Sequence, residues 1–274
     1  MLSVNTNAGA LVALQNLNKT NMALNETQNR INTGFKVAGP KDNAAVFQIA
    51  QNLRADLASM GAVKQSLDRA ISTVDIALAG GESVSDLLNQ MRAKAVAAAD
   101  PGQDAASRTA LKNDFEALRD QITTIVDNAT FNGSNMLKNG GVGVSAIVSP
   151  DGTANVTVSA QDLSLTGSTI SITAGTTFTT ATEAAAIVTA IDNSIAAVNA
   201  ALGALGTGAK TLEAQRTFAD KLSDTIETGI GNLVDADLAK ESANLQSLQV
   251  KQQLGIQALS IANQSPQVLL ALFR

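Results

Sequence analysis

The sequence predicts a mainly α-helical protein: an elongated, hairpin-like rod of long heptad helices, with a terminal coiled-coil pair, a helical bundle and a small antiparallel β region at the tip. Three observations predict this fold class. Apolar residues recur at helical spacing through most of the 274 residues. Residues 1–18 and 252–273 carry no charged side chain. Residues 131–179 instead alternate apolar side chains with Ser or Thr, which is the period of a half-buried strand.

The composition excludes several classes of function. Charged residues make up 16% of the chain, against roughly a quarter in ordinary soluble domains, and the net charge is −5. This acidic balance argues against a nucleic-acid partner, because phosphate contacts need Lys and Arg. The chain has no Cys and no His, which excludes thiol and imidazole catalysis and the usual zinc ligands. We therefore expect no enzyme activity, no catalytic residue, no metal and no cofactor.

Neither end has the pattern of a signal peptide or a membrane span. No Lys or Arg precedes the short apolar run at 11–14, so a secretory signal peptide is not predicted. Gln, Asn and Pro interrupt residues 252–273 well before about 18 consecutive apolar residues. We expect no membrane partner, and export from the cell would need another route.

The first two predicted helices carry a 4-3 spacing of apolar residues. The first runs from about Asn5 to residue 33 and ends at Gly34; amides in its stripe, such as Asn21, help to fix register. The second starts with Asp42 as N-cap and runs to about residue 99. The interpretation makes Gly80-Gly81 its weak point, at about 1 kcal/mol per Gly. Its heptad positions are Val46, Leu53, Met60, Leu67, Val74, Gly81, Leu88 and Ala95, with Leu57, Ile71 and Leu78 as companions.

A third helix and the β region follow the Asp-Pro-Gly turn at 100–102. The spacing over 111–129 predicts a helix that folds back antiparallel on the second. Strands are expected at 156–159, 163–165 and 170–173, with a hydroxyl-rich exposed face. The glycines at 140, 141 and 143 precede a strand, which favours a hairpin turn over a nucleotide-binding loop.

Two further helices complete the chain. Thr180 and Glu183 form a capping box for the next helix, whose heptad runs from Ile191 to Leu233. Asp235 or Asp237 then opens the last helix; two carboxylates are too few for a divalent cation, and an N-cap explains them better. The last helix carries two apolar stripes, which imply contacts on two sides.

This order of elements predicts three parts. Residues 1–43 and 235–274 form a terminal helical domain, and residues 44–130 and 180–234 form a helical rod domain. Residues 131–179 form a small β-hairpin region of the rod domain.

The uncharged ends are the candidate functional site. Amide-lined helices without charged outer faces are suited to being covered by other helices on several sides, and the natural source is other copies of the chain. The predicted subunit-interface residues are Leu11, Leu14, Leu17, Asn21, Leu24, Ile31, Leu245, Leu248, Leu254, Leu259, Ile261, Val268, Leu269 and Leu272.

Five segments resemble the bacterial flagellins. They are 4–17 (VNTNAGALVALQNL), 30–34 (RINTG), 38–45 (AGPKDNAA), 131–133 (FNG) and 257–267 (QALSIANQSPQ). The resemblance covers about residues 3–137 and 182–274, at both ends and in order. It is strongest to the short flagellins of alphaproteobacteria, which lack large outer domains.

The resemblance implies a secreted, extracellular subunit of the flagellar filament that serves swimming motility. It implies export by the flagellar type III apparatus, and a tube whose inner wall is made by the terminal helices. The implied partners are other copies of the chain, other flagellins, hook-associated and cap proteins and an export chaperone, with no nucleic acid and no membrane. The alternatives are a hook–filament junction protein of the same family and a hydroxyl-rich surface adhesin that uses the small sheet.

One segment departs from the family pattern. Flagellins that activate the flagellin-sensing Toll-like receptor usually carry a characteristic segment at the end of the second helix, which here is 89–97. Arg92, Ala95 and Val96 keep that pattern, whereas Gln90, Ala93 and Lys94 depart from it. Lys94 places a charge where the family has an apolar contact, so the resemblance implies weak or absent activation.

Overall fold

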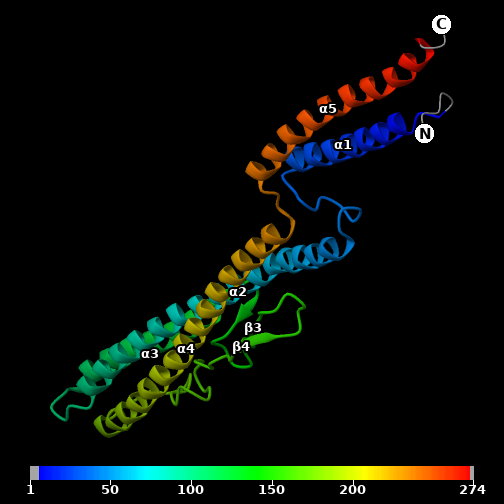
Figure 1. Ribbon diagram of the computed structural model, residues 1–274. Helices are drawn as coiled ribbons and strands as arrows, with labels where there is room; N and C mark the ends of the chain where they lie inside the picture. The colour runs from blue at the N-terminus through cyan, green and yellow to red at the C-terminus, as the bar shows by residue number, and fades with distance from the viewer. Residues whose placement is uncertain (1–5, 272–274) are drawn as a thin grey trace. The chain divides into compact units, whose positions relative to one another are not determined.

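The protein is mainly α-helical, as the sequence predicts. The computed structural model describes the backbone of residues 6–271 and the side chains of residues 6–264 (Figure 1). This described part contains five helices: α1 (Ala8–Thr33), α2 (Ala44–Ala98), α3 (Ala105–Asn128), α4 (Ala181–Val234) and α5 (Leu238–Ala271). It also contains two two-stranded antiparallel sheets, formed by β1 (Thr130–Phe131) with β2 (Ser134–Asn135) and by β3 (Val144–Ile147) with β4 (Asn155–Val158).

The chain divides into two compact units. The terminal unit contains the chain up to Ala55 and from Thr225 onward, and the central unit is Asp56–Asp224. The divisions fall inside α2 and α4, while the three-part division drawn from the sequence stays a prediction. Each unit is described below by itself.

Local signals set the helix ends. Gly34 ends α1 as predicted: it has φ 74° and its N–H donates to the Arg30 carbonyl at 2.9 Å. The predicted start near Asn5 lies outside the described residues; in the described part, α1 begins at Ala8 and Asn7 is its N-cap, accepting from the Ala10 N–H at 3.0 Å. Asp42 was also wrong as the N-cap of α2. Its carboxylate instead accepts from the N–H groups of the preceding loop, and Asn43 accepts from the Val46 N–H at 3.1 Å.

Helix α2 contributes two heptad stripes to the core of the central unit. The predicted positions from Met60 to Ala95 are buried, although Val46 and Leu53 are only half-buried. The predicted companions Ile71 and Leu78 are also only half-buried. The fully buried companion stripe lies three residues after each heptad position and consists of Val63, Ala70, Ala77, Val84, Met91 and Ala98. Helix α2 is therefore enclosed on a wider face than was predicted.

Gly80-Gly81 is a site of close packing and does not interrupt α2. A Cβ on Gly80 would lie 2.8 Å from Leu137 Cδ1, and one on Gly81 would lie 2.7 Å from Leu202 Cδ2. The two glycines let α4 and the β region approach the helix backbone. The low helix propensity of the two glycines destabilises α2 locally, and the close packing that they allow offsets this loss.

Helix α3 returns antiparallel along α2, as predicted. Asp104 caps it by accepting from the Ser107 N–H at 2.6 Å. The Arg108 guanidinium donates to the Ala98 carbonyl at 3.0 Å, which satisfies the end of α2. The Phe115 ring is fully buried and meets the Phe178 ring edge to face, with centroids 5.4 Å apart.

The β1–β2 hairpin follows α3 directly. Asn132 and Gly133 have φ of 48° and 78°, as a two-residue type I′ hairpin turn requires. Asn135 is buried; its amide donates to the Val126 carbonyl at 2.7 Å, and its oxygen accepts from the Leu137 N–H at 2.8 Å. The Asn135 side chain therefore caps α3 and ties the hairpin to it.

Only one of the three predicted strands forms. The segment 156–159 belongs to β4, which pairs with β3 across the predicted turn at Gly152. The predicted strands 163–165 and 170–173 were wrong: they meet only through one isolated bridge, between Leu165 and Ile170. The apolar side chains of these two segments are buried in the core of the central unit. Burial against helices, rather than strand pairing, produces their alternation.

Helix α4 begins with the predicted capping box. The Thr180 hydroxyl accepts from the Glu183 N–H and the Glu183 carboxylate accepts from the Thr180 N–H, both at 3.2 Å. Its heptad is buried from Ile191 to Ala219. By length and composition α4 could cross a membrane, with a window of mean hydropathy 1.5, yet this stripe packs into the core of the central unit.

Candidate subunit interface on the terminal helices

Helices α1 and α5 lie antiparallel and side by side in the terminal unit (Figure 1). The backbone joins their bases: the Lys36 N–H donates to the Val234 carbonyl at 2.7 Å, and the Ala236 N–H donates to the Gly34 carbonyl at 2.9 Å. Asp237 is the N-cap of α5 and accepts from the Ala239 N–H at 3.0 Å, so of the two predicted acids Asp237 opens the helix. The two helices therefore enter the pair from a common, hydrogen-bonded base.

The seam between α1 and α5 is apolar with polar links along its length. Leu24 is buried, and Leu17 fits against Gly255, where a Cβ would lie 3.2 Å from Leu17 Cδ1. The Gln252 amide donates to the Asn21 side-chain oxygen at 2.8 Å. The Asn7 amide donates to the Ala262 carbonyl at 2.7 Å. Because each amide has its partner at one register only, these links fix the antiparallel alignment.

A shared arginine closes the seam near the base. One Arg30 nitrogen contacts Glu26 at 2.5 Å and another contacts Glu241 Oε1 at 3.4 Å. Glu241 is 8% exposed, and its Oε2 is buried without a hydrogen-bond partner. The placement suits the helix dipoles, since Arg30 is in the last turn of α1 and Glu241 is in the first turn of α5.

The structure divides the predicted interface residues into two sets. The seam of the pair itself contains Leu17, Asn21, Leu24, Ile31, Leu245, Leu248 and Leu259, which are buried or half-buried. The outward faces, which here mean the exposed surfaces of the pair, carry Leu11, Leu14, Leu254 and Ile261, exposed by 61%, 43%, 57% and 69%. Leu11 and Leu14 lie at the edge of the seam, where they line a groove with Leu259. Leu272 and the side chains of Val268 and Leu269 lie outside the described residues. The first set is used within the chain, and the second set is free to meet another molecule.

Further exposed apolar residues of α1 and α5 extend this outward set, among them Val12, Met22, Val250 and Ile256. Met22 is 64% exposed and Val250 is 55% exposed. Met22 was missed because it does not belong to the 4-3 stripe. The sequence pattern that could have pointed to Met22 is its spacing from Leu11: the two residues are eleven apart, which is close to three helical turns.

An open groove of about 440 Å³ lies at the free end of the pair. Its walls are Thr6, Asn7, Ala10, Leu11, Leu14, Leu259 and Asn263. Apolar side chains and uncharged amides line it, and no ionisable group is among them. A groove of this composition suits another uncharged helix better than a charged ligand.

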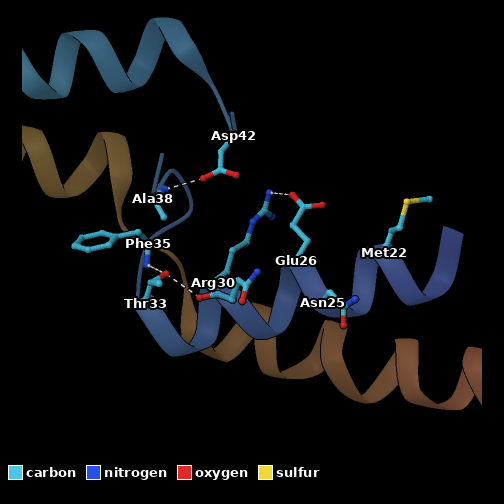
Figure 2. Close-up of a pocket in the computed structure, with 9 residues that line it drawn as sticks. Met22, Asn25, Glu26, Arg30, Thr33, Phe35, Ala38 and Asp42 are labelled. Carbon is cyan, nitrogen blue, oxygen red and sulfur yellow. Dashed lines mark hydrogen bonds and ion pairs between the residues drawn. The ribbon is translucent and has the colours of Figure 1, made fainter. Parts of the chain in front are cut away.

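A second hollow, of about 310 Å³, lies at the base of α1 (Figure 2). Met22 and Phe35 border it, and Glu26, Arg30 and Asp42 supply its charged wall, with Glu26 and Arg30 turned toward one another. The Phe35 ring also packs under the Arg54 guanidinium, 5.9 Å from its centroid. In the described part of the chain, no group of three or more acidic, His or Cys side chains is arranged to hold a metal ion.

Ion pairs of the central unit lie between helices. Arg216 of α4 contacts Asp68 of α2 at 2.7 Å and also pairs with Asp220. Hydrogen bonds from the Arg216 and Lys64 side chains lower the pKa of Asp220, and the Asp220 and Asp68 carboxylates raise the pKa of Arg216. These ion pairs link α2 to α4 and support their alignment, and they do not line a cleft.

The receptor-segment residues lie on the surface of α2. Gln90 and Ala93 are exposed, and Arg92 reaches Asp192 of α4 at 2.5 Å. The Lys94 ammonium has a partner within the chain, since it contacts Asp114 of α3 at 2.7 Å. Sequence spacing could not supply this partner, because it depends on how α3 folds back on α2.

Both ends of the chain match known sequences. Residues 4–141 match the bacterial flagellin N-terminal helical region, and residues 188–273 match the bacterial flagellin C-terminal helical region. The chain is 51% identical over 272 residues to flagellin FljM of Caulobacter vibrioides, covering 99% of this chain and 98% of that protein. It is 36% identical over 283 residues to a flagellin of Brucella melitensis, covering 100% of both chains.

One solved structure is similar at the level of the fold. A putative flagellar hook-associated protein from Vibrio parahaemolyticus is similar with a TM-score of 0.57 and 15% identity, covering 71% of this chain and 100% of that chain. At this identity the likeness concerns the fold alone.

Proposed function

The chain belongs to the bacterial flagellin family, and from that premise we propose that it is the structural subunit that self-assembles into the flagellar filament for swimming motility. Members of this family are structural filament proteins and not enzymes. The filament is the extracellular part of the flagellum.

The outward faces of the α1–α5 pair carry the proposal. A helix pair that projected into water alone would place charged residues on these faces. Leu11, Leu14, Leu254 and Ile261 stand there instead, among amides and small residues. Neighbouring subunits would remove this surface from water, and Val268, Leu269 and Leu272 would extend the contact toward the end of the chain.

We propose the remaining partners by analogy with the family. The subunit would leave the cell through the flagellar type III apparatus with an export chaperone. It would add beneath a distal cap and follow the hook-associated proteins, and the filament could include other flagellins. The comparisons give no support to the adhesin alternative. A hook–filament junction protein would have the same terminal helices but would stop growth after a short assembly.

Reconstitution with an outward-face variant tests the proposal. The double variant Leu254→Gln/Ile261→Gln keeps the seam and removes two side chains that are 57% and 69% exposed in the subunit. Full burial of such a side chain stabilises by about 1.5–3 kcal/mol, so the exposed part is worth about 1–2 kcal/mol each. The critical concentration should therefore rise at least about 30-fold, at tenfold per 1.4 kcal/mol.

The matched control is Val142→Gln, which makes the same chemical change in the central unit at a side chain that is 73% exposed. It should leave the critical concentration unchanged in sedimentation assays, with filaments visible by negative-stain microscopy. Polymerisation of the double variant at the wild-type critical concentration would refute the interface. Short wild-type assemblies that stop growing would favour the junction protein.

A further inference from the structure

A small polar hollow of about 130 Å³ lies in the central unit, between α2 and the β region. Four residues of α2 and five of the β region line it: Ser66, Arg69, Ala70, Thr73, Phe131, Asn132, Ser134, Val144 and Ser145. The lining contains one positive charge and no carboxylate. All of these residues belong to one chain, so the hollow exists without contacts between subunits.

The Arg69 guanidinium is the charged group of the hollow. Arg69 is exposed, and its guanidinium makes no ion pair, hydrogen bond or ring contact within the described residues. No acidic residue stands three or four positions away on α2, where a partner would be expected. The other arginines whose side chains the structure describes do have partners, which are carboxylates for Arg30, Arg92, Arg119 and Arg216, backbone carbonyls for Arg108 and the Phe35 ring for Arg54.

The serine hydroxyls of the hollow have protons left to donate. The Ser66 oxygen accepts from the Ile147 N–H at 3.1 Å, so this hydrogen bond does not use the Ser66 proton. The Ser145 oxygen accepts from the Thr157 hydroxyl at 3.3 Å, with the same consequence. The Ser134 hydroxyl makes no hydrogen bond within the described residues. Three hydroxyl donors from α2, β2 and β3 therefore remain for a ligand.

The other walls favour an anion as well. The Thr73 hydroxyl donates to the Arg69 carbonyl at 2.8 Å, which holds its proton on the helix. Phe131 and Val144 are half-buried and give the hollow apolar walls. Apolar walls exclude part of the water, which strengthens the attraction between a cation and an anion placed there.

The volume limits the size of the ligand. At about 30 Å³ for each water of the liquid, a hollow of 130 Å³ holds about four waters. Drug-sized ligands occupy pockets of about 300–1,000 Å³, so a nucleotide or a sugar chain is too large. A single phosphate or sulfate group has the right size.

We infer that this hollow binds a tetrahedral oxyanion, inorganic phosphate or sulfate, with Arg69 as the charged ligand and Ser66, Ser134 and Ser145 as hydroxyl donors. The planar fork of a guanidinium matches two oxygens of such an anion, and the hydroxyls can reach the others. A bound anion would link α2 to both hairpins and stabilise the central unit by mass action. The inference is independent of filament assembly.

A titration of full-length, unpolymerised subunits with sodium phosphate, followed by amide chemical shifts, tests the site. Sodium chloride keeps the ionic strength constant, so that screening does not change during the titration. Saturable shifts are expected at the amides of residues 66–73, 131–134 and 144–147, with a dissociation constant in the millimolar range. Sodium sulfate should displace phosphate, whereas sodium acetate, which offers fewer oxygens, should bind more weakly.

Four variants separate the site from a general effect of charge. Arg69→Gln should weaken phosphate binding by at least about tenfold, because hydrogen bonds to charged groups are the stronger ones. Lys210→Gln is the matched control: it removes one positive charge from an exposed side chain of α4 outside the hollow, and should leave the dissociation constant unchanged. Arg69→Lys keeps the charge without the fork and should fall between wild type and Arg69→Gln. Ser145→Ala keeps Arg69 and should weaken binding about two- to tenfold.

Several results would overturn the inference. They are shifts that do not saturate, an unchanged dissociation constant in Arg69→Gln, and equal losses in Arg69→Gln and Lys210→Gln, which would indicate a response to net charge alone. Acetate that binds as tightly as phosphate would overturn the assignment to a tetrahedral anion. If Arg69→Gln altered the circular dichroism spectrum, Ser145→Ala would decide instead, and wild-type affinity in that variant would overturn the site.

Discussion

Gly208 of α4 and the β3–β4 hairpin allow a sharp test of the packing. A Cβ at Gly208 would lie 2.6 Å, 2.9 Å and 3.3 Å from three side-chain atoms of Val158 in β4. Val158 is 6% exposed, and its branched Cβ leaves it few rotamers with which to yield. A Cβ at Gly206, two residues earlier on the same helix, would have no neighbouring atom within 4 Å. The two glycines therefore differ in surroundings but not in secondary structure.

The two Gly→Ala variants should move stability in different directions. Ala gains about 1 kcal/mol over Gly in a helix interior, so Gly206→Ala should stabilise the central unit by about that amount. Gly208→Ala makes the same gain but forces extra volume into a packed core, at a cost of about 1–3 kcal/mol. The two variants should differ by about 1–3 kcal/mol, with Gly208→Ala the less stable.

Urea unfolding of unpolymerised subunits, followed by far-UV circular dichroism, measures this difference. With an m value of about 2–3 kcal/mol/M, the two midpoints should be separated by roughly 0.3–1.5 M. Val158→Ala in the Gly208→Ala background should recover part of the difference, because it removes the clashing methyl groups. The reasoning is refuted if Gly208→Ala is as stable as Gly206→Ala.

Four further predictions follow from the structure. Asn21→Leu should destabilise filaments by about 1–3 kcal/mol, since it leaves the Gln252 amide unpaired, and the double variant Asn21→Leu/Gln252→Leu should recover most of the thermal stability. Asn21→Leu should also lock the filament shape, and unchanged polymorphic switching in motility tracking would contradict this. Hydrogen bonds, chiefly from the Thr179 N–H, lower the pKa of Glu183, so its stabilising effect is present at neutral pH and is lost as the pH falls through its folded pKa; Glu183→Gln should flatten the acid side of the stability curve. The Lys94 segment should give weak or absent Toll-like receptor activation in reporter cells, and a response equal to that of a stimulating flagellin would refute this. Deletion of residues 265–274 should give soluble monomers with cooperative melting, and filaments at the normal critical concentration would refute it.

Features that depend on near neighbours in sequence were predicted well. Gly34 ends α1 because a glycine tolerates the left-handed backbone that the cap needs, and Thr180 with Glu183 caps α4 through groups three residues apart. Such signals are complete within a few residues. The choice of Asn43 over Asp42 as N-cap shows their limit, since both residues can cap and only the path of the loop decides between them.

Features that depend on distant partners could not be predicted. Ala70 and Ala77 are weak hydrophobic signals, and only the approach of other elements shows that they are buried as deeply as Val74. The alternation around Leu163 and Ile172 is the same for a strand and for a loop pressed against helices. In the same way, both stripes of α5 are apolar, and only the position of α1 shows which stripe is used within the chain and which is free.

The backbone hydrogen bonds at the base of the α1–α5 pair have a mechanical consequence. The residues that leave α1 and those that enter α5 are tied to each other by Lys36 with Val234 and by Gly34 with Ala236, and Phe35 and Asp235 form a bridge between them. When the filament turns, torque that enters through either connection is divided between two strands that must shear together, rather than peel apart one bond at a time. The base therefore resists load through all of its backbone hydrogen bonds together, and the force at which it fails is set by their sum and not by the weakest bond.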